Sequence, residues 1–168
     1  MNVVTAGVYL TIGERFLFVF GPNPAGDRLA IVRVGGHREP GETAWECAAR
    51  EALEETGLTI EALPVSTGPD WHEPGPRPLL VLPRDTGVTV MFLARAEGAP
   101  QPCSEVQGLL LLSREEILAL CAQPTTLQAF LDAGGQAWMR RPYPPEMILE
   151  PVLQCRLLAR LLADRHLT

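Results

Sequence analysis

Lysine is absent from the 168-residue sequence, so all 14 of its basic side chains are arginine. The 20 acidic residues outnumber them, and the formal net charge at pH 7 is -6. A chain with this charge has little attraction for nucleic-acid polymers or anionic lipid surfaces, so we expect neither as a partner. An anionic substrate would instead need metal ions or a local group of arginines, whose planar guanidinium groups suit phosphate oxygens. A genome-wide compositional bias explains the missing lysine more simply.

Long apolar runs and paired cysteines are also missing. No apolar run approaches the roughly 20 residues that cross a bilayer, and no basic region precedes an apolar run at the N-terminus. The sequence therefore predicts a cytoplasmic protein without membrane association. Cys47, Cys103, Cys121 and Cys155 are too far apart for a C-x-x-C metal or redox motif, so we expect reduced thiols in the core.

Apolar segments of strand length occur along the chain up to Ser113. They predict strands at 3–12, 15–20, 29–34, 87–96 and 109–113. Six prolines between positions 64 and 83 confine that segment to loop and brief edge strands. The composition is that of a globular protein, with 46% hydrophobic and 20% charged residues. The pattern predicts an α+β fold around a single sheet.

The tail of the chain shows helical signals. Ser113 and Glu116 form a capping box before an apolar run. A last helix is expected with Pro151 at its start and a stripe of leucines along one side. We treat residues 114–168 as a helical C-terminal extension of one domain that spans the whole chain, because 168 residues suit a single core.

A further helix is predicted between two well-marked ends, at residues 44–56. Thr43 followed by Glu46 forms a capping box, and Gly57 suits the left-handed position that ends a helix. With about 3.6 residues per turn, the inner face consists of Trp45, Ala48, Ala49, Ala52 and Thr56. We expect this face to pack on the sheet.

Glu51, Glu54 and Glu55 fall together on the other side of this helix, at spacings that make their side chains neighbours. One interpretation is a solvated helix face relieved by Arg50, because exposed like charges cost only about 0.2 to 0.5 kcal/mol per pair. The other interpretation is a group of carboxylates that binds a metal. Spacing alone does not separate the two.

The residues just before the helix favour the metal site. A strand runs into Gly35 and Gly36, which we expect to form a turn, and Glu42 follows at the helix entrance. Three carboxylates on a rigid helix beside a glycine turn supply the oxygen ligands that Mg²⁺ prefers, with substrate phosphates completing its coordination shell. We therefore predict Mg²⁺ as the cofactor, with Mn²⁺ as an alternative.

The segment from Gly36 to Leu58 resembles the Nudix box, the signature of the Nudix hydrolase family. The defined positions of the box are occupied here by Gly36, Glu42, Arg50, Glu51, Ala52, Glu54, Glu55, Gly57 and Leu58. Ala52 departs from the pattern because a larger aliphatic residue is usual there. Upstream, the sequence RVGGH at 33–37 stands where Leu-Pro-Gly-Gly is common. Neither departure removes a charged position.

This resemblance implies an α/β/α sandwich around a mixed sheet, and hydrolysis of a nucleotide-like small molecule in which a nucleoside diphosphate is linked to another group. It assigns metal binding to Glu51, Glu54 and Glu55, and Glu51 is the general base in some relatives. Arg50 would hold these glutamates in register. The loop and helix around them would be supported by Gly35, Gly36, Glu42 and Gly57.

Other site residues are expected outside the box. Relatives often add a metal-binding glutamate from a later loop, for which Glu105 is our candidate and Glu97 its rival. Trp71 and Arg77 lie in the proline-rich loop, where the ring could stack on a base and the guanidinium could reach a phosphate. The alternative for Trp71 is packing at the edge of the core.

A second function is also compatible with this resemblance, namely a Nudix-fold module that binds a nucleotide without hydrolysing it. Such proteins usually lose one or more glutamates of the box, whereas this chain retains all of them. The C-terminal extension is expected either to cap the pocket or to form a homodimer. The leucine-rich last helix is compatible with both.

Overall fold

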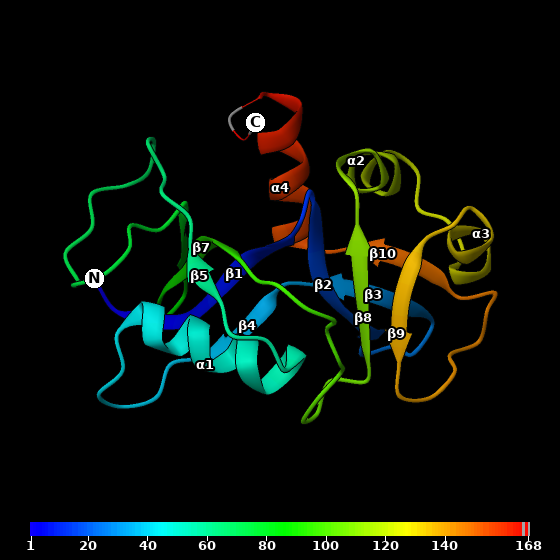
Figure 1. Cartoon of the computed structure of the whole chain (residues 1–168), viewed down its shortest axis with the longest axis horizontal. Helices are drawn as coiled ribbons and strands as arrows, with labels where there is room; N and C mark the ends of the chain where they lie inside the picture. Colours follow the sequence, from blue (N-terminus) through cyan, green and yellow to red (C-terminus); the bar gives the residue numbers. More distant parts are fainter. Residues whose placement is uncertain (166, 168) are drawn as a thin grey trace.

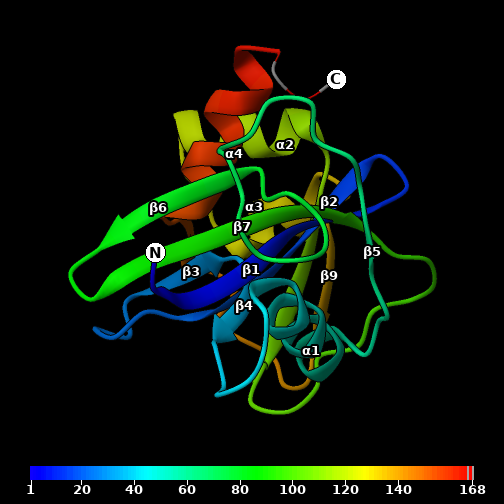
Figure 2. The same ribbon diagram turned by 90° about the vertical axis from the view of Figure 1, so that its left-hand side faces the viewer.

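A mixed β-sheet runs through the molecule and has helices on both of its faces (Figures 1 and 2). The computed structural model describes residues 1–165 and 167. Over this part of the chain the strands are β1 (Val3–Ile12), β2 (Arg15–Pro22), β3 (Arg28–Val32), β4 (Val34–His37), β5 (Glu61–Ala62), β6 (Leu80–Arg84), β7 (Gly87–Arg95), β8 (Gly108–Leu112), β9 (Gln136–Met139) and β10 (Ile148–Pro151). The helices are α1 (Ala44–Thr56), α2 (Arg114–Ala122), α3 (Leu127–Asp132) and α4 (Leu153–Ala163).

Strand β1 lies at the centre of the sheet. One of its edges pairs in parallel with β7. Its other edge has two antiparallel partners, because residues 5–8 pair with β4 and residues 10–12 pair with β2. Strand β3 pairs with β2, so the chain changes partner between β3 and β4, at Arg33. The sheet therefore divides beside β1.

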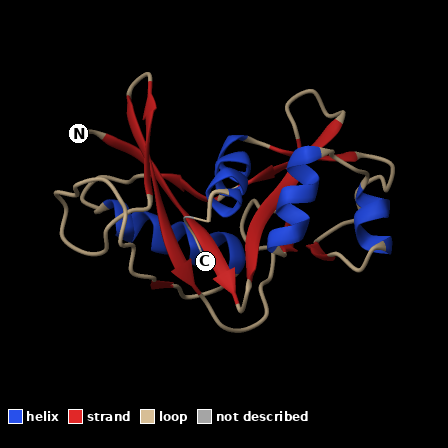
Figure 3. Cartoon of the chain, turned by 90° about the horizontal axis from the view of Figure 1, so that it is seen from above, coloured by secondary structure: helices blue, strands red, loops and turns tan. Residues whose placement is uncertain are grey.

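The two faces of the sheet bury separate apolar clusters. On the face that we call the α1 face, Ala6, Val8 and Leu10 of β1 cluster with the inner residues of α1. On the opposite α4 face, Tyr9 and Phe18 cluster with residues of α2, α3 and α4. Figure 2 shows α1 below the sheet and α2 and α4 above it, and Figure 3 shows the helices spread along the sheet. The predicted α/β/α sandwich is confirmed.

Four of the predicted strands match β1, β2, β7 and β8 to within two residues. The fifth prediction, a strand over 29–34 that leads into a Gly35-Gly36 turn, is wrong in part. The chain breaks at Arg33, and both glycines lie inside β4, where they pair with Gly7 and Ala6 of β1. An apolar run looks continuous in sequence even where its two halves pair with different strands.

The prediction of a helical extension over 114–168 is wrong in part, because this segment also contains two strands. Strand β9 pairs with β8, and β10 pairs in parallel with β3, so the tail completes the sheet. Pro151 is the last residue of β10 instead of the start of the last helix, and Val152 is the N-cap of α4. Of the leucine stripe, Leu158 is fully buried, whereas Leu153 is 59% exposed.

The cysteines are all free thiols. Cys47 and Cys155 are buried as expected, whereas Cys103 and Cys121 are only partly buried. Among the helices of the described residues, none combines the length and the apolar character that crossing a membrane requires.

Candidate active site

Helix α1 begins and ends where the sequence predicts. The Thr43 hydroxyl accepts a hydrogen bond from the Glu46 N–H at 3.1 Å, and the Glu46 carboxylate accepts one from the Thr43 N–H at 2.7 Å. Gly57 has φ 73°, in the left-handed region, and its N–H donates to the Leu53 carbonyl at 3.0 Å. The helix is therefore held at both ends, which fixes the direction of the side chains that it carries.

Glu73 adds a contact at the start of α1 that the sequence did not reveal. Its Oε1 accepts from the Ala44 N–H at 3.0 Å, and its Oε2 forms an ion pair with Arg38 Nη2 at 3.0 Å. The first N–H groups of a helix have no partner within the helix, and a carboxylate there also interacts favourably with the helix dipole. Glu73 thereby ties the proline-rich loop to the beginning of the helix.

The inner face of α1 is rotated slightly from the predicted one. Its buried residues are Ala44, Cys47, Ala48, Ala52 and Thr56. Ala49 and Trp45 are only partly buried, and the Trp45 ring lies edge-to-face on Phe92 at 5.3 Å. Small side chains at the contact let the helix approach the sheet closely. This closeness brings its glutamates next to β4.

Arg50 connects the acidic residues of the box. Its guanidinium forms a two-pronged ion pair with Glu42, with Nη2 to Oε2 at 3.1 Å. Its Nη1 donates to Glu51 at 3.0 Å and to Glu54 at 3.2 Å. Nη2 also donates to the His37 carbonyl of β4 at 3.0 Å. One cation therefore holds three carboxylates together against the sheet, where Coulomb repulsion would otherwise separate them.

These ion pairs shift the pKa values of both partners. The hydrogen bond from Arg50 lowers the pKa of the Glu42 carboxyl below its usual value. The same hydrogen bond raises the pKa of the Arg50 guanidinium above its already high value, and the bond to Glu51 adds to this increase. Both groups remain charged over the whole physiological range.

The two glycines of β4 lie against the carboxylates of Glu51 and Glu55. A Cβ at Gly36 would overlap with the Glu51 carboxyl group, so the absence of a side chain there leaves the space that Glu51 fills. The Gly35 N–H donates to Glu55 Oε1 at 2.7 Å. Burial raises the pKa of Glu55 to about 7, and the negative charge of Glu51 acts in the same direction, whereas the Gly35 hydrogen bond opposes the rise.

The structure thus brings together the predicted residues of the box. In the described part of the chain, however, no three acidic, histidine or cysteine side chains are already arranged to hold a metal ion. Arg50 occupies oxygens of Glu51 and Glu54 in this arrangement. The donor set fits a hard divalent cation, because it consists of carboxylates on one rigid helix beside the two glycines of β4.

The candidate ligands outside the box lie in other surroundings. Glu105 is exposed in the loop before β8, where it lines a cleft of about 390 Å³ with Val32 and Tyr143. Its carboxylate forms no hydrogen bond or ion pair with the described residues. Glu97 is exposed beside Gly57 at the end of α1. The metal-binding role of either residue stays a prediction.

Within the described residues, the proposed substrate residues of the proline-rich loop form no hydrogen bond or ion pair with the carboxylates of α1. The Trp71 ring packs edge-to-face on Phe92 at 6.4 Å and lies 4.9 Å from the His72 ring, so it covers the edge of the core as the alternative expected. Arg77 is exposed and forms no ion pair with a residue that the structure describes. Contact of Trp71 and Arg77 with a substrate stays a prediction.

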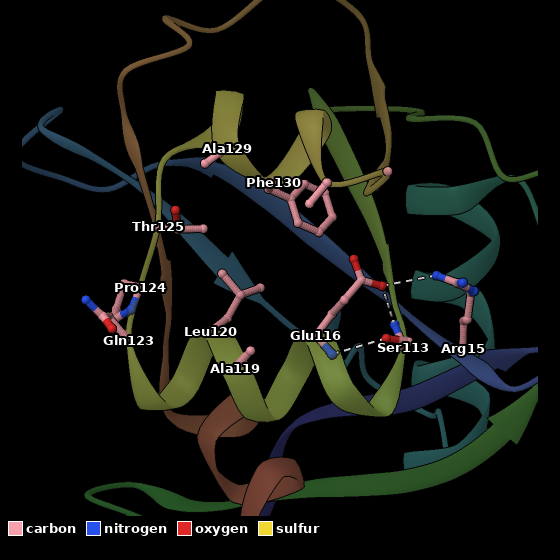
Figure 4. Close-up of a pocket in the computed structure, with 12 residues that line it drawn as sticks. Arg15, Ser113, Glu116, Ala119, Leu120, Gln123, Pro124, Thr125, Ala129 and Phe130 are labelled. Atoms are coloured by element: carbon pink, nitrogen blue, oxygen red, sulfur yellow. Dashed lines mark hydrogen bonds and ion pairs between the residues drawn. The ribbon is translucent and has the colours of Figure 1, made fainter.

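A cavity of about 670 Å³ lies between α2 and α3, on the α4 face of the sheet (Figure 4). At one end Glu116 receives the Ser113 N–H at 2.9 Å and forms an ion pair with Arg15 at 3.0 Å. Leu120, one turn further along α2, and Phe130 of α3 add apolar side chains to the lining of the cavity. The charged groups of this cavity satisfy one another, and none of the predicted site residues lines it.

Comparison with known proteins agrees with the fold and with the box. The NUDIX domain model matches residues 1–133. Among solved structures, a NUDIX family hydrolase from Clostridium perfringens has a TM-score of 0.54 at 20% identity, covering 70% of this chain and 85% of that one. The E. coli ORF135 protein has a TM-score of 0.50 at 18% identity, covering 71% and 79%. A protein from Chromobacterium violaceum, assigned to the nudix hydrolase family, has a TM-score of 0.53 at 16% identity and covers 97% and 78%.

Proposed function

The chain belongs to the Nudix hydrolase family, and we propose that it hydrolyses the pyrophosphate bond of a nucleoside diphosphate linked to another group. We assign the binding of the required divalent cation, Mg²⁺ or alternatively Mn²⁺, to Glu51, Glu54 and Glu55, with Glu105 as a further ligand. The substrate is a nucleotide-like small molecule.

The observation that carries this proposal is the arrangement of carboxylates around Arg50. Glu42, Glu51 and Glu54 all bond to this one guanidinium, and Glu55 is bonded to the backbone of β4. A solvated helix face would leave its glutamates directed into water and independent of the sheet. Here the helix caps, the ion pairs and the glycines of β4 all direct them to the same place, which supports a binding site.

The side chains of this site have distinct roles in the proposed reaction. Bound there, the cation would neutralise diphosphate charge and lower the pKa of a water molecule. Glu51 accepts the proton of the attacking water, while Glu42 and Arg50 keep Glu51 and Glu54 in position. Because burial raises the pKa of Glu55 to about 7, Glu55 would have to release its proton to serve as a metal ligand near neutral pH.

A hydrolysis screen tests the proposal. Wild-type protein is incubated with Mg²⁺ or Mn²⁺ and a panel of nucleoside triphosphates, ADP-ribose, nucleotide sugars, dinucleoside polyphosphates and coenzyme A, and phosphate-containing products are measured. We expect at least one substrate to be cleaved, and we expect Glu54→Gln and Glu55→Gln to abolish its cleavage. Glu115→Gln is the matched control, because Glu115 is an exposed glutamate in the first turn of α2.

Two outcomes would contradict the proposal. If no member of the panel is cleaved, the chain is better described as a module that binds a nucleotide without hydrolysing it. If Glu54→Gln and Glu55→Gln cleave as fast as the Glu115→Gln control, then the carboxylates of α1 are not the reactive centre.

A further inference from the structure

Three positions of β1 form a row on the α4 face of the sheet. Thr5, Gly7 and Tyr9 alternate along the strand and therefore point to the same face. The Tyr9 hydroxyl at one end of the row donates to the Gln154 carbonyl of α4 at 2.8 Å. Gly7 has no side chain, and the side chain of Arg33 lies over it. A Cβ on Gly7 would stand only 2.8 Å from Arg33 Nε and 2.9 Å from its Cδ.

Arg33 forms no ion pair with a residue in the described part of the chain. Its Nε is fully buried and makes no hydrogen bond. No carboxylate of the described residues lies within ion-pair distance of its guanidinium, although Arg38 and Arg15 each have one and Arg50 has several. A buried donor without a partner destabilises the folded state, so a protein gains little by keeping one unless a ligand uses it.

Arg84 lies next to Arg33 on the same face. Its Nη1 donates to Thr5 Oγ1 at 3.2 Å and to Thr89 Oγ1 at 3.4 Å, which holds its guanidinium over the adjacent position of the row. Arg84 is thus held at Thr5 and Arg33 lies over Gly7, which are neighbouring same-face positions of β1 about 7 Å apart. Burial lowers the pKa of Arg33, and the charge of Arg84 lowers it further, while Glu55 opposes both effects.

Only the backbone of β4 separates these arginines from the carboxylates of α1. Gly35 pairs with Gly7, over which Arg33 lies, and the Gly35 N–H is bonded to Glu55. Because Gly35 and Gly36 carry no side chains, charged groups can approach the strand from both faces. The basic pair and the acidic group are therefore adjacent and on opposite sides of one thin strand.

We propose that Arg33 and Arg84 form an anion-binding site on the α4 face that holds phosphoryl oxygens of the substrate across β4 from the carboxylates of α1. The site rests on the proposed function for the identity of its ligand, a diphosphate. Neither residue takes part in bond cleavage. Arg33 supplies its buried Nε and its outer Nη atoms, and Arg84 supplies the part of its guanidinium that Thr5 and Thr89 leave free.

The chemistry of the pair favours a diphosphate over other anions. Each guanidinium is planar and presents donors in a fork that matches two phosphate oxygens. Two such forks over neighbouring positions of one strand suit an anion with several oxygens on two adjacent phosphorus atoms. The protein as a whole has a net charge of -6, so anion binding needs a local site of this kind.

Calorimetric titration with methylenediphosphonate tests this site without hydrolysis. The titrant has a P–C–P bridge that resists cleavage. The protein is first treated with EDTA, so that bound metal ions do not contribute to the measured affinity. We expect saturable binding to wild type, weaker by about tenfold or more in Arg33→Leu, because this variant loses charge-assisted hydrogen bonds to the phosphonate oxygens. We also expect weaker binding in Arg84→Met, and wild-type affinity in Arg160→Met, which changes an exposed arginine of α4.

The design guards against variants that fail to fold. Leucine replaces Arg33 because leucine is common at this position in the Leu-Pro-Gly-Gly sequence that precedes the Nudix box. The thermal unfolding transition of each variant is measured before titration. Malonate is titrated in parallel to separate phosphoryl recognition from attraction for any dianion. Wild-type affinity in Arg33→Leu, equal binding of malonate, or no binding to wild type would each overturn the assignment.

The outcome is independent of the proposed hydrolysis. Loss of methylenediphosphonate binding is measured without metal and without turnover, so it can succeed or fail whichever substrate the screen identifies. Where a substrate is known, Arg33→Leu should raise its KM about tenfold or more and leave kcat within about threefold. A variant that lowers kcat alone would show that Arg33 acts on the reaction step, which contradicts a binding role.

Discussion

Two arginines on opposite sides of β4 differ in what they contact. Arg50, on the α1 face, bonds to three carboxylates and to the carbonyl of His37. Arg33, on the α4 face, lies over Gly7 with a buried Nε that has no partner in the described chain. The two arginines thus have different roles. The donors of Arg50 are used to hold acidic groups of the protein together, whereas those of Arg33 are left for an anion from outside.

The largest expected effect comes from changing the shape of the acidic side without changing a charge. Gly36→Ala would place a methyl group where the Glu51 carboxyl lies. We expect hydrolysis to fall about 10²- to 10³-fold, because displacement of a reacting group by about 1 Å can cost 10²-fold.

A matched glycine variant provides the control for that change. A Cβ on Gly21 would be 3.6 Å from the Tyr143 hydroxyl, an ordinary contact distance, so Gly21→Ala should keep wild-type activity. Steady-state kinetics on a substrate from the screen gives both values. If Gly36→Ala hydrolyses that substrate as fast as Gly21→Ala, the position of Glu51 against β4 has no part in the reaction.

The pH dependence of stability tests the environment of Glu55. Its pKa is raised to about 7 in the folded protein, so between about pH 4.5 and 7 the folded state binds a proton that the unfolded state has released. The metal-free protein should therefore lose stability as pH rises through this window, by up to about 3 kcal/mol. Urea unfolding at a series of pH values measures the slope.

Glu55→Gln isolates this contribution. The variant lacks the titrating group, so its free energy of unfolding should fall less between pH 4.5 and 7 than that of wild type, and it should be the more stable protein at pH 8. Parallel curves for the two proteins would show that Glu55 titrates near its ordinary value.

Replacing Arg50 and Arg33 one at a time tests whether the two arginines differ in their contribution to stability. Arg50→Met leaves three carboxylates together without their cation, and we expect the metal-free protein to lose about 2 kcal/mol of stability. Mg²⁺ should restore part of this loss. Arg33→Leu removes an unpartnered donor, so stability should be unchanged or higher. Equal losses in Arg50→Met and Arg33→Leu, measured by urea unfolding, would contradict the difference between the two sides.

The smallest expected effects come from removing the N-caps of α1 and α2, each of which begins with its own capping box. Thr43→Ala in α1 and Ser113→Ala in α2 remove equivalent caps, and each should cost about 1 kcal/mol in urea unfolding. Only Thr43→Ala should also lower activity, because only α1 carries the reactive carboxylates. A similar loss of activity in Ser113→Ala would mean that the fold as a whole, not α1, limits the reaction.

The parts of the site that could be predicted from sequence are those encoded by neighbouring residues. The bounds of α1 depend on Thr43, Glu46 and Gly57, which act within one or two turns of the helix. The grouping of Glu51, Glu54 and Glu55 follows from helical periodicity. The strands β1, β2, β7 and β8 carry their own apolar patterns, and the sandwich follows from packing helices on both faces.

The parts that could not be predicted depend on contacts between distant residues. Glu73 is 29 residues from its hydrogen-bond partner Ala44, in a loop whose sequence shows no helix signal. Strand β10 forms because it pairs with β3, which is far away in the chain. Arg33 ends a run that looks like one strand, and only the change of partner from β2 to β1 shows why the chain turns there.

Manganese titration of the metal-free protein tests the central claim most directly. Free Mn²⁺ is followed by its electron paramagnetic resonance signal in wild type, in Glu54→Gln, in Glu55→Gln and in the Glu115→Gln control. The account predicts a saturable site in wild type and in the control that is weakened about tenfold or more in the two α1 variants. Equal Mn²⁺ binding by all four proteins would contradict it, because the carboxylates of α1 would then not be the metal ligands.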